Sequence, residues 1–389
     1  MTCECELAPH GQEDADWWVL SDRTDDDGRP LREDHVLGVG GASTTLAQLT
    51  VRRPVRRALD IGTGCGVQAL HLSRHAAQVT ASDSVPRALQ LAATGFALSG
   101  IDVELVEGDL VAPVAGREFD LVVCNPPFVV GPSSRFAYRD SGREGDAMSR
   151  DAVRGAAQVL APGGVAQLLV NWLHVRGEDW RDRAASWVAD LGCDAWVIER
   201  DVQEPVEYVS TWLADAGERD ESLAREWLRW FDDVGVEGVG FGWVTLRRGS
   251  APHRVAVEPV SHPVDQPLGP HIADWLDRVD WLRSREDEAL LAAALRVSEN
   301  ARLDVASTPP EWETVGRMLS LDEGFRWQLP CDEATAALVQ GCDGRTPLRA
   351  LVAVLSAVLD EPEPAVAAAA AATARGLVDR GLLLPPPPR

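Results

Sequence analysis

Between residues 55 and 248, short apolar runs alternate with longer segments whose apolar residues recur at helical spacing. Strands that alternate with helices build βαβ units, whose helices cover both faces of a mostly parallel sheet. The pattern therefore predicts an α/β domain with seven strands. These are Arg57–Gly62, Gln78–Asp83, Val103–Asp109, Phe119–Asn125, Gly164–Trp172, Ala195–Asp201 and Gly240–Arg248.

The chain of 389 residues is longer than one ordinary domain, so a second, smaller domain is expected. After Arg248 the sequence becomes rich in proline and glycine and loses its periodicity, which predicts a boundary near residue 250. The remainder has the pattern of a smaller α+β domain, with helices around Trp275–Leu295, a strand pair at 301–307 and 325–330, and two or three further helices. The predicted divisions are a polar leader with a flap (1–50), the α/β domain (51–250) and an accessory domain (251–389).

The formal net charge of −24 narrows the choice of partners. Proteins that bind long nucleic acids usually carry a basic surface, because phosphate contacts supply most of their non-specific affinity. The dense basic cluster at Val51–Arg57 is explained equally well as a solvated segment before a strand. The negative net charge therefore favours a binding partner other than RNA or DNA.

No apolar run approaches the roughly 18 residues of a membrane span, and the first residues lack the pattern of a secretory signal. We therefore expect a cytoplasmic protein without a membrane partner. The pair Cys3 and Cys5 stands without a second ligand cluster, so no metal is predicted. Four histidines show no ligand spacing and are predicted to be structural or exposed: His71, His75, His174 and His262.

Three glycines, Gly62, Gly64 and Gly66, follow the first predicted strand directly and precede a helix. A glycine-rich turn of this kind lets the backbone approach a ligand, and the helix N-terminus favours an anionic group. Asp83 and Asp109 end the second and third strands, where carboxylates can accept hydrogen bonds from ribose hydroxyls and from an adenine amino group. Together these residues predict a nucleoside site at the strand ends.

The fourth strand runs into Asn125-Pro126-Pro127-Phe128. One interpretation is that the prolines merely stop the strand. The other is a rigid wedge, in which the Asn125 oxygen accepts a hydrogen bond from a target N–H and Phe128 offers a ring for stacking. Pro126 and Pro127 would hold these groups in place without ordering cost.

In this order the motifs resemble the class I S-adenosylmethionine (SAM) dependent methyltransferases, over about residues 35 to 248. The resemblance implies a Rossmann-like seven-stranded sheet with a reversed last strand, and SAM as cofactor. It also implies that Asp60 supports the methionine end of SAM, Asp83 the ribose, and Asp109 with Leu110 the adenine. The implied cofactor-binding set is Asp60, Gly62, Thr63, Gly64, Gly66, Asp83, Ser84, Asp109, Leu110 and Asn125.

The Asn-Pro-Pro-Phe spelling is similar to that of the N-methyltransferase subgroup that includes release-factor glutamine and ribosomal RNA base methyltransferases. In this subgroup the methyl acceptor is a planar nitrogen. The resemblance gives the catalytic set as Asn125, Pro126, Pro127 and Phe128.

Two flanking segments are candidates for closing the site. The polar stretch 135–153 contains Tyr138, Arg139 and Asp140, which are either substrate contacts, together with Phe128, or part of an ordinary helix N-cap. The stretch Asp34–Leu49 fits a flap over SAM in which Thr44 and Thr45 touch the cofactor.

The segment Leu329–Pro385 distantly resembles the winged-helix peptide chaperones of the pyrroloquinoline quinone family. That likeness implies a winged-helix-like module that binds or presents a peptide. Nucleic-acid binding is the second interpretation, because the segment is not basic.

The leading hypothesis is a SAM-dependent methyltransferase that acts on a planar nitrogen, amide or amine, of a protein, peptide or peptide-like natural product. The first alternative is a ribosomal RNA base N-methyltransferase, with RNA the less favoured acceptor. The second is a SAM-binding sensor without enzymatic activity.

Overall fold

The computed structural model describes residues 5–12, 15–23, 32–132, 143–215 and 221–387. The chain divides into two compact units, Met1–Ser261 and His262–Arg389. The boundary expected near residue 250 precedes a strand, β10 (Val255–Pro259), that pairs with the sheet of the first unit. Its short apolar core lies between proline-rich flanks, which hid it in the sequence.

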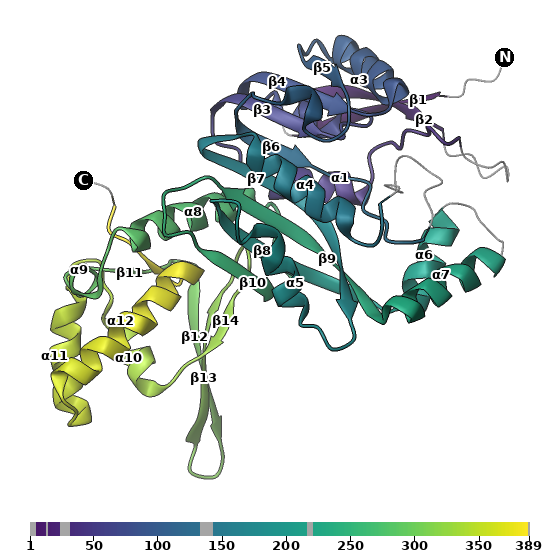
Figure 1. The fold of residues 1–389 in the computed structure, drawn as a ribbon. Coiled ribbons are helices and arrows are strands. Elements are labelled where there is room, and N and C mark those ends of the chain that lie inside the picture. Colours follow the sequence, from purple (N-terminus) through teal and green to yellow (C-terminus); the bar gives the residue numbers. More distant parts are fainter. Residues whose placement is uncertain (1–4, 13–14, 24–31, 133–142, 216–220, 388–389) are drawn as a thin grey trace. The chain divides into compact units, whose positions relative to one another are not determined.

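The first unit is built on an eight-stranded sheet (Figure 1). All seven expected strands are present, and β10 adds an eighth at the edge, where Pro259 is tolerated because edge strands leave N–H groups unpaired. Every pairing is parallel except those of β9 with its two neighbours. In spatial order the sheet consists of β5 (Glu104–Glu107), β4 (Ala76–Asp83), β3 (Val55–Ile61), β6 (Phe119–Cys124), β7 (Leu160–Val175), β9 (Val236–Arg247), β8 (Asp194–Gln203) and β10.

The central strands are buried at consecutive positions, as Val122, Val123 and Cys124 of β6 illustrate. Consecutive burial means that both faces of the sheet are covered, as the βα alternation predicts. A core cluster joins β3, β6 and β7 to two of the helices, α4 and α5. The helices of this unit are α1 (Gly41–Leu49), α2 (Val67–Leu72), α3 (Pro86–Ser99), α4 (Ala147–Gln158), α5 (Trp180–Val188), α6 (Pro205–Asp215), α7 (Glu221–Val234) and a 3₁₀ turn, η1 (Ala112–Val114).

The N-terminal segment, expected to be a polar leader, forms an antiparallel hairpin of β1 (Cys5–Gln12) and β2 (Ala15–Asp22). In β2 the alternate residues Trp17 and Val19 are buried. The hairpin lies close against α3, where a Cβ added to Gly95 would meet the Trp18 carbonyl oxygen at 2.9 Å. The first strand, Cys5–Gln12, is largely polar and contains proline and glycine, so the sequence gives no clear strand pattern there.

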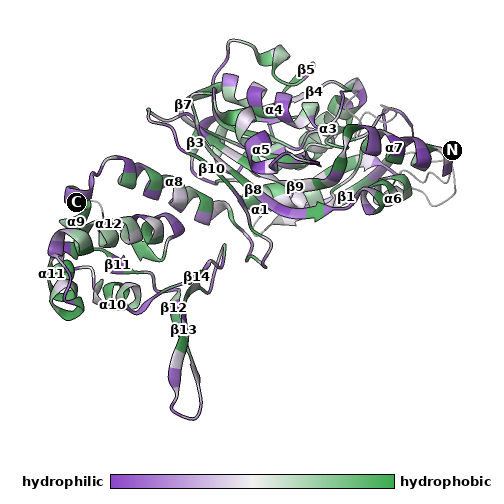
Figure 2. Ribbon diagram, turned by 60° about the horizontal axis from the view of Figure 1, so that its bottom comes forward, coloured by the Kyte–Doolittle hydropathy of each residue, from purple (hydrophilic) through white to green (hydrophobic). Residues whose placement is uncertain are grey.

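The second unit contains a three-stranded antiparallel sheet, β12 (Ala301–Thr308), β13 (Glu313–Leu321) and β14 (Gln328–Pro330). The expected strand pair therefore needs correction, because β13 lies between its two members. Figure 2 shows hydrophobic residues along α11, which packs on α12. The other elements are α8 (Gly269–Arg283), α9 (Asp287–Leu291), β11 (Arg296–Val297), α10 (Glu333–Gly341), α11 (Leu348–Leu359), α12 (Glu363–Arg380) and β15 (Leu383–Leu384).

The turn between α10 and α11 is closed by Asp343, whose Oδ1 accepts hydrogen bonds from the backbone of Arg345 (2.8 Å) and Thr346 (2.7 Å). Helices α8 to α12 together with the small sheet agree with the expected α+β class. The finer winged-helix likeness stays a prediction. In the part of the chain that the structure describes, no helix combines the length and apolar character needed to cross a membrane.

Candidate active site

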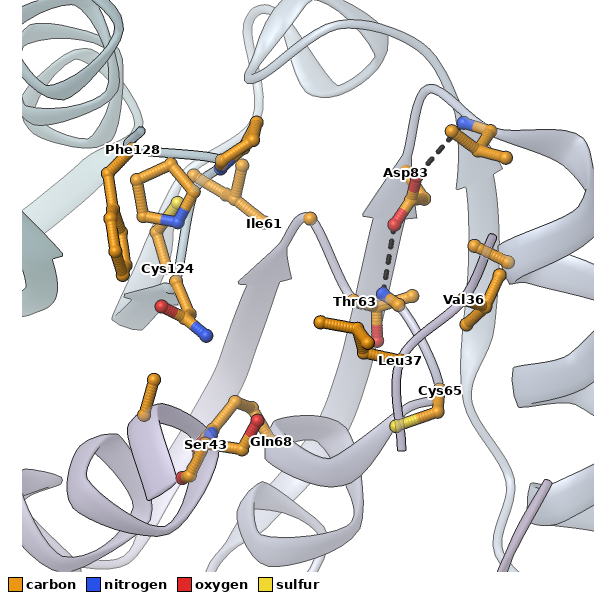
Figure 3. A pocket seen from close by; sticks show the side chains of 18 of the residues that line it. Val36, Leu37, Ser43, Ile61, Thr63, Cys65, Gln68, Asp83, Cys124 and Phe128 are labelled. Carbon is orange, nitrogen blue, oxygen red and sulfur yellow. Dashed lines mark hydrogen bonds between the residues drawn. The ribbon is translucent and has the colours of Figure 1, made fainter. Parts of the chain in front are cut away.

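A cavity of about 350 Å³ opens at the carboxyl ends of the parallel strands β3, β4 and β6 (Figure 3). Ligands of open α/β sheets bind outside these strand ends, and a volume of roughly 300 to 1,000 Å³ suits a drug-sized ligand. Asp83 and Phe128 lie on opposite sides of the cavity in Figure 3. We call these sides the cofactor half and the acceptor half. The cofactor half is the glycine loop (62–66) with Asp83 and Asp109, and the acceptor half is Asn125–Phe128 with Trp212.

The glycine loop joins β3 to α2 in a conformation that few residues other than glycine adopt. Gly62, Gly64 and Gly66 have φ angles of 71°, 55° and 90°. At Gly66 an added Cβ would also lie 2.7 Å from the ring of Phe96. Glycine is therefore required there both by backbone strain and by close packing.

Asp60 lies beneath this loop and is 1% exposed. Its Oδ2 accepts hydrogen bonds from the Thr63 hydroxyl (2.6 Å) and the Ala69 backbone (3.2 Å). Burial raises the pKa of Asp60 to about 7, although these two hydrogen bonds oppose the rise. Its Oδ1 is shielded from solvent and has no hydrogen-bond partner among the described residues. Asp60 therefore holds the loop in place from beneath the cavity.

Asp83 ends β4 and points toward the loop (Figure 3). Its Oδ2 accepts from the Gly64 backbone and its Oδ1 from the Val85 backbone, both at 2.9 Å. Burial raises the pKa of Asp83 above its ordinary value, while the backbone hydrogen bonds oppose that shift. The carboxylate thus fixes the loop, and each oxygen keeps further lone pairs for a ligand hydroxyl.

Asp109 lines the cavity beyond β5, and its side chain is 63% exposed. Its Oδ2 accepts a hydrogen bond from Arg143 at 2.6 Å. The next residue, Leu110, also lines the cavity and has a φ angle of 47°, a strained value for leucine. This side of the cofactor half is held more loosely than Asp83.

The acceptor half begins where β6 ends. Asn125 Oδ1 is shielded from solvent and, within the described residues, has no hydrogen-bond partner. The Asn125 carbonyl oxygen lies 4.0 Å from the position of a Cβ added to Gly62, so the wedge and the glycine loop approach each other closely. The Phe128 ring meets the Trp212 ring edge-on, with centroids 6.2 Å apart at 76°. A cavity wall of this kind offers acceptor atoms and aromatic faces side by side.

Most of the site residues expected from the sequence come together around this cavity, while their roles stay predictions. Asp60 and Gly66 support it from below rather than line it. Tyr138, Arg139 and Asp140 lie outside the described residues. The expected residues that line the cavity are Gly62, Thr63, Gly64, Asp83, Ser84, Asp109, Leu110, Asn125, Pro126, Pro127 and Phe128.

The expected flap contributes to the cavity through its first part. Residues 35–38 and 40–43 line it, and Gln68 Nε2 donates to the Ser43 carbonyl at 2.7 Å. Thr44 and Thr45 are not lining residues, and the Thr44 hydroxyl instead donates to the Gly40 carbonyl at 3.2 Å. The two threonines belong to the first turns of α1, which turns them away from the cavity.

The sequence interpretation missed Trp212 of α6, which lines the acceptor half. Tyr208 lies four residues before it on the same helix, with the two rings 6.0 Å apart. Aromatic residues at this spacing share a helix face. That spacing was the available signal.

Histidines and cysteines supply no obvious chemistry here. His71 Nε2 lies 3.0 Å from His10 Nε2, and His174 Nε2 lies 2.7 Å from Glu199. Cys65 lines the cavity, but burial raises its thiol pKa to about 12, so the thiol stays protonated near neutral pH. Within the described ranges, no three His, Cys, Asp or Glu side chains gather as a metal site would require.

Residues 38–173 match the model of the methyltransferase small domain family. The chain contains a class I methyltransferase domain. The expected Rossmann-like fold and family are therefore confirmed. Residues 273–385 match a second model, described only as a domain of unknown function.

Among similar proteins is the release factor glutamine methyltransferase of Deinococcus radiodurans, 37% identical over 161 residues. This match covers 38% of the chain and 57% of that protein. Another is the ribosomal RNA small subunit methyltransferase C of Alcanivorax borkumensis, 32% identical over 132 residues, with 34% and 37% covered. The ribosomal protein uL3 glutamine methyltransferase of Bradyrhizobium diazoefficiens is 33% identical over 148 residues, with 34% and 46% covered. The chain spans about half the length of the relatives it matches, so it shares their methyltransferase domain and not their whole extent.

Among solved structures, a 16S rRNA N2 G1207 methyltransferase of T. thermophilus in complex with AdoMet and guanosine has a TM-score of 0.36 at 19% identity. The match covers 50% of this chain and 48% of the T. thermophilus chain. The family assignment rests on the sequence matches.

Proposed function

We propose that the cavity binds SAM and that the protein transfers the methyl group to a planar nitrogen of a protein, peptide or peptide-like metabolite. The observation that carries this proposal is Asn125 Oδ1, a buried acceptor atom with no partner among the described residues. It lies in the wall of the cavity that the glycine loop also lines. A buried polar atom without a partner costs roughly 1 to 3 kcal/mol, which a bound N–H donor would recover.

The residues of the cofactor half fit SAM. Asp83 would accept hydrogen bonds from the ribose, Asp109 and Leu110 would meet the adenine edge, and the loop above Asp60 would hold the methionine end. Asp60 fixes that loop through Thr63 and Ala69, and the cavity volume of about 350 Å³ suits the size of SAM. When bound, SAM supplies an electrophilic methyl group on its sulfonium.

On the acceptor side, Asn125 would accept a hydrogen bond from the target N–H and so direct the nitrogen lone pair toward the cofactor half. Pro126 and Pro127 restrict the backbone and keep the asparagine in place. Phe128 gives the planar group a face to stack on. Alignment contributes strongly to such a reaction, since effective molarities reach about 10⁵ to 10⁸ M.

A protein amide is the preferred acceptor. Release factor and uL3 glutamine methyltransferases are among the relatives, and the net charge of −24 opposes binding to RNA phosphates. A ribosomal RNA base is the second candidate, because a ribosomal RNA methyltransferase is also among the relatives. The charge further suits a basic protein acceptor in the cytoplasm.

We propose that the second unit presents a peptide acceptor, on the likeness of Leu329–Pro385 to peptide chaperones. A SAM-binding sensor without enzymatic activity would not need a wedge with an unpartnered acceptor atom. The wedge therefore favours an enzyme over the sensor.

The test is transfer of radiolabelled methyl from SAM into protein, small-molecule and RNA fractions of a bacterial extract. We expect label in the protein fraction and none with the Asn125→Ala variant. Label confined to ribosomal RNA would overturn the choice of acceptor. SAM binding without label in any fraction would favour the sensor instead.

A further inference from the structure

The connection between β8 and β9 is helical. These strands are antiparallel neighbours, and such neighbours can be joined by a loop of two to five residues. Here the connection contains α6 and α7. The two helices pack on each other and on β9, and a core cluster joins them to the segment after the wedge. A helical connection that packs on the segment after the wedge suggests that these helices contribute to the site.

Both helices form side-chain hydrogen bonds with the backbone of one residue, Val130. The Val130 backbone N–H donates to the Tyr208 hydroxyl of α6 at 2.8 Å. The Trp227 indole N–H of α7 donates to the Val130 carbonyl at 2.9 Å. Tyr208 is fully buried and Trp227 nearly so, which makes both bonds costly to leave unmade. Val130 follows Phe128 by two residues, so the two bonds fix the exit of the wedge.

The chain next to Val130 is adapted to the same contact. A Cβ added to Gly131 would lie 2.8 Å from the Trp227 ring. Only glycine therefore lets the indole approach the backbone closely enough to reach Val130. The two hydrogen bonds to Val130 therefore belong to a closely packed contact and not to a chance contact at the surface.

The third contact shapes the cavity itself. Trp212 of α6 and Phe128 of the wedge both line the acceptor half, and their rings stand at 76° to each other. Two rings at nearly a right angle form a corner that can meet both the face and the edge of a flat group. Trp212 is supported from behind by Tyr208, the residue that holds Val130.

We propose that the α6–α7 insertion is the acceptor-recognition element of this site. Trp212 contacts the planar acceptor and sets specificity, while Tyr208 and Trp227 are positioning residues that act through Val130 on Asn125 and Phe128. The inference rests on the proposed function and deepens it. The fitting acceptor is a flat group bearing N–H, such as a side-chain amide or the exocyclic amine of a base.

The positioning role is tested first without any acceptor. Hydrogen–deuterium exchange of the segment 125–131 is compared between the wild type, Tyr208→Phe and Trp227→Phe. We expect the Val130 amide to exchange at least about tenfold faster in Tyr208→Phe, because only the hydroxyl that accepts from it is lost. The matched control is Trp230→Phe, which makes the same ring change on α7, where Trp230 packs on Phe231. Unchanged exchange in Tyr208→Phe would overturn the positioning role.

The specificity role is tested by methyl transfer to the extract fraction that the wild type labels, with SAM affinity measured by calorimetry in parallel. Trp212→Ala should raise the acceptor KM about tenfold or more and leave SAM affinity unchanged. Trp212→Phe keeps an aromatic ring and should therefore bring the acceptor KM most of the way back to the wild-type value. Tyr208→Phe and Trp227→Phe should lower kcat about tenfold and leave KM within about twofold.

The outcomes separate this inference from the function on which it rests. No transfer by the folded, SAM-binding wild type contradicts the proposed function, and the assignment of Trp212 falls with it. Transfer by the wild type with an unaltered KM in Trp212→Ala contradicts the inference alone. A loss of SAM affinity in Trp212→Ala would also contradict it, because Trp212 would then belong to the cofactor half.

Discussion

The two halves of the cavity are built in different ways. The cofactor half is local: Asp60, Asp83 and the glycine loop lie within one βαβ unit and bind one another through hydrogen bonds of 2.6 to 3.2 Å. The acceptor half is assembled from distant segments, since the wedge at 125–128 depends on residues at 208, 212 and 227. A local unit can be shared by many enzymes, whereas an assembled wall can change with the acceptor.

Variants in the two halves should therefore differ in their effects. Changes in the cofactor half should affect stability and SAM affinity together, because the same hydrogen bonds serve both. Changes in the acceptor half should affect transfer and spare SAM affinity.

The largest effect is expected from Asp60. Its folded-state pKa of about 7 lies above the ordinary 3.8, so the folded protein keeps a proton on Asp60 that the unfolded chain releases. The stability contributed by Asp60 is therefore full below about pH 4 and is lost as the pH rises to about 7. This difference corresponds to a loss on the order of 4 kcal/mol.

The Asp60→Asn variant lacks this titration. Its free energy of unfolding, measured in urea at several pH values, should rise relative to the wild type between about pH 4 and 7 and stay level above. Parallel curves for the two proteins would show that Asp60 titrates normally.

Next in size is Gly66→Ala, for which we expect a loss of about 2 to 3 kcal/mol in the free energy of unfolding. The alanine would combine a φ angle of 90° with contact against Phe96. Gly64→Ala is the matched control, because its φ angle is also positive but no atom lies within 4 Å of the added Cβ. It should cost about 1 kcal/mol. Equal losses would mean that strain alone, without packing, requires glycine at Gly66.

Asp83→Ala should weaken SAM binding by about 1 to 3 kcal/mol, or roughly ten- to a hundredfold, measured by calorimetry. The variant loses the acceptor for ribose hydroxyls and leaves the Gly64 and Val85 N–H groups without their carboxylate. If SAM affinity is unchanged, the ribose is bound elsewhere in the cavity.

Asp109→Ala should give the smallest change, less than about 1 kcal/mol in SAM affinity. Its carboxylate is largely exposed and already paired with Arg143, and exposed pairs contribute little. A loss as large as that of Asp83→Ala would show that the adenine edge is held as tightly as the ribose.

The sequence predicted which residues of the cofactor half line the cavity, because this half is local. Gly62, Asp83 and Asp109 are recognisable because the turn and the strand ends that place them are encoded within a few residues. The mostly parallel sheet follows from βα alternation, and the reversed last strand follows from the family resemblance. The place of these residues along the chain was therefore enough to predict that they lie at the cavity.

What the sequence left out depends on contacts between distant residues. Trp212 faces the cavity because α6 folds back over the wedge. The four-residue spacing from Tyr208 predicts a shared helix face, but it does not tell which part of the chain that face contacts. The strand β10 and the hairpin β1–β2 are short or polar and gain their strand form through pairing and packing with the rest of the unit. Short strands of this kind are specified by their partners more than by their own residues.

The most direct test of the separation between the halves is calorimetry of SAM binding to the Asn125→Ala variant, alongside its rate of methyl transfer. We predict a SAM affinity within about threefold of the wild type and a transfer rate lowered by about a hundredfold or more. A large loss of SAM affinity with appreciable transfer would contradict the account, because Asn125 would then hold the cofactor and not the acceptor.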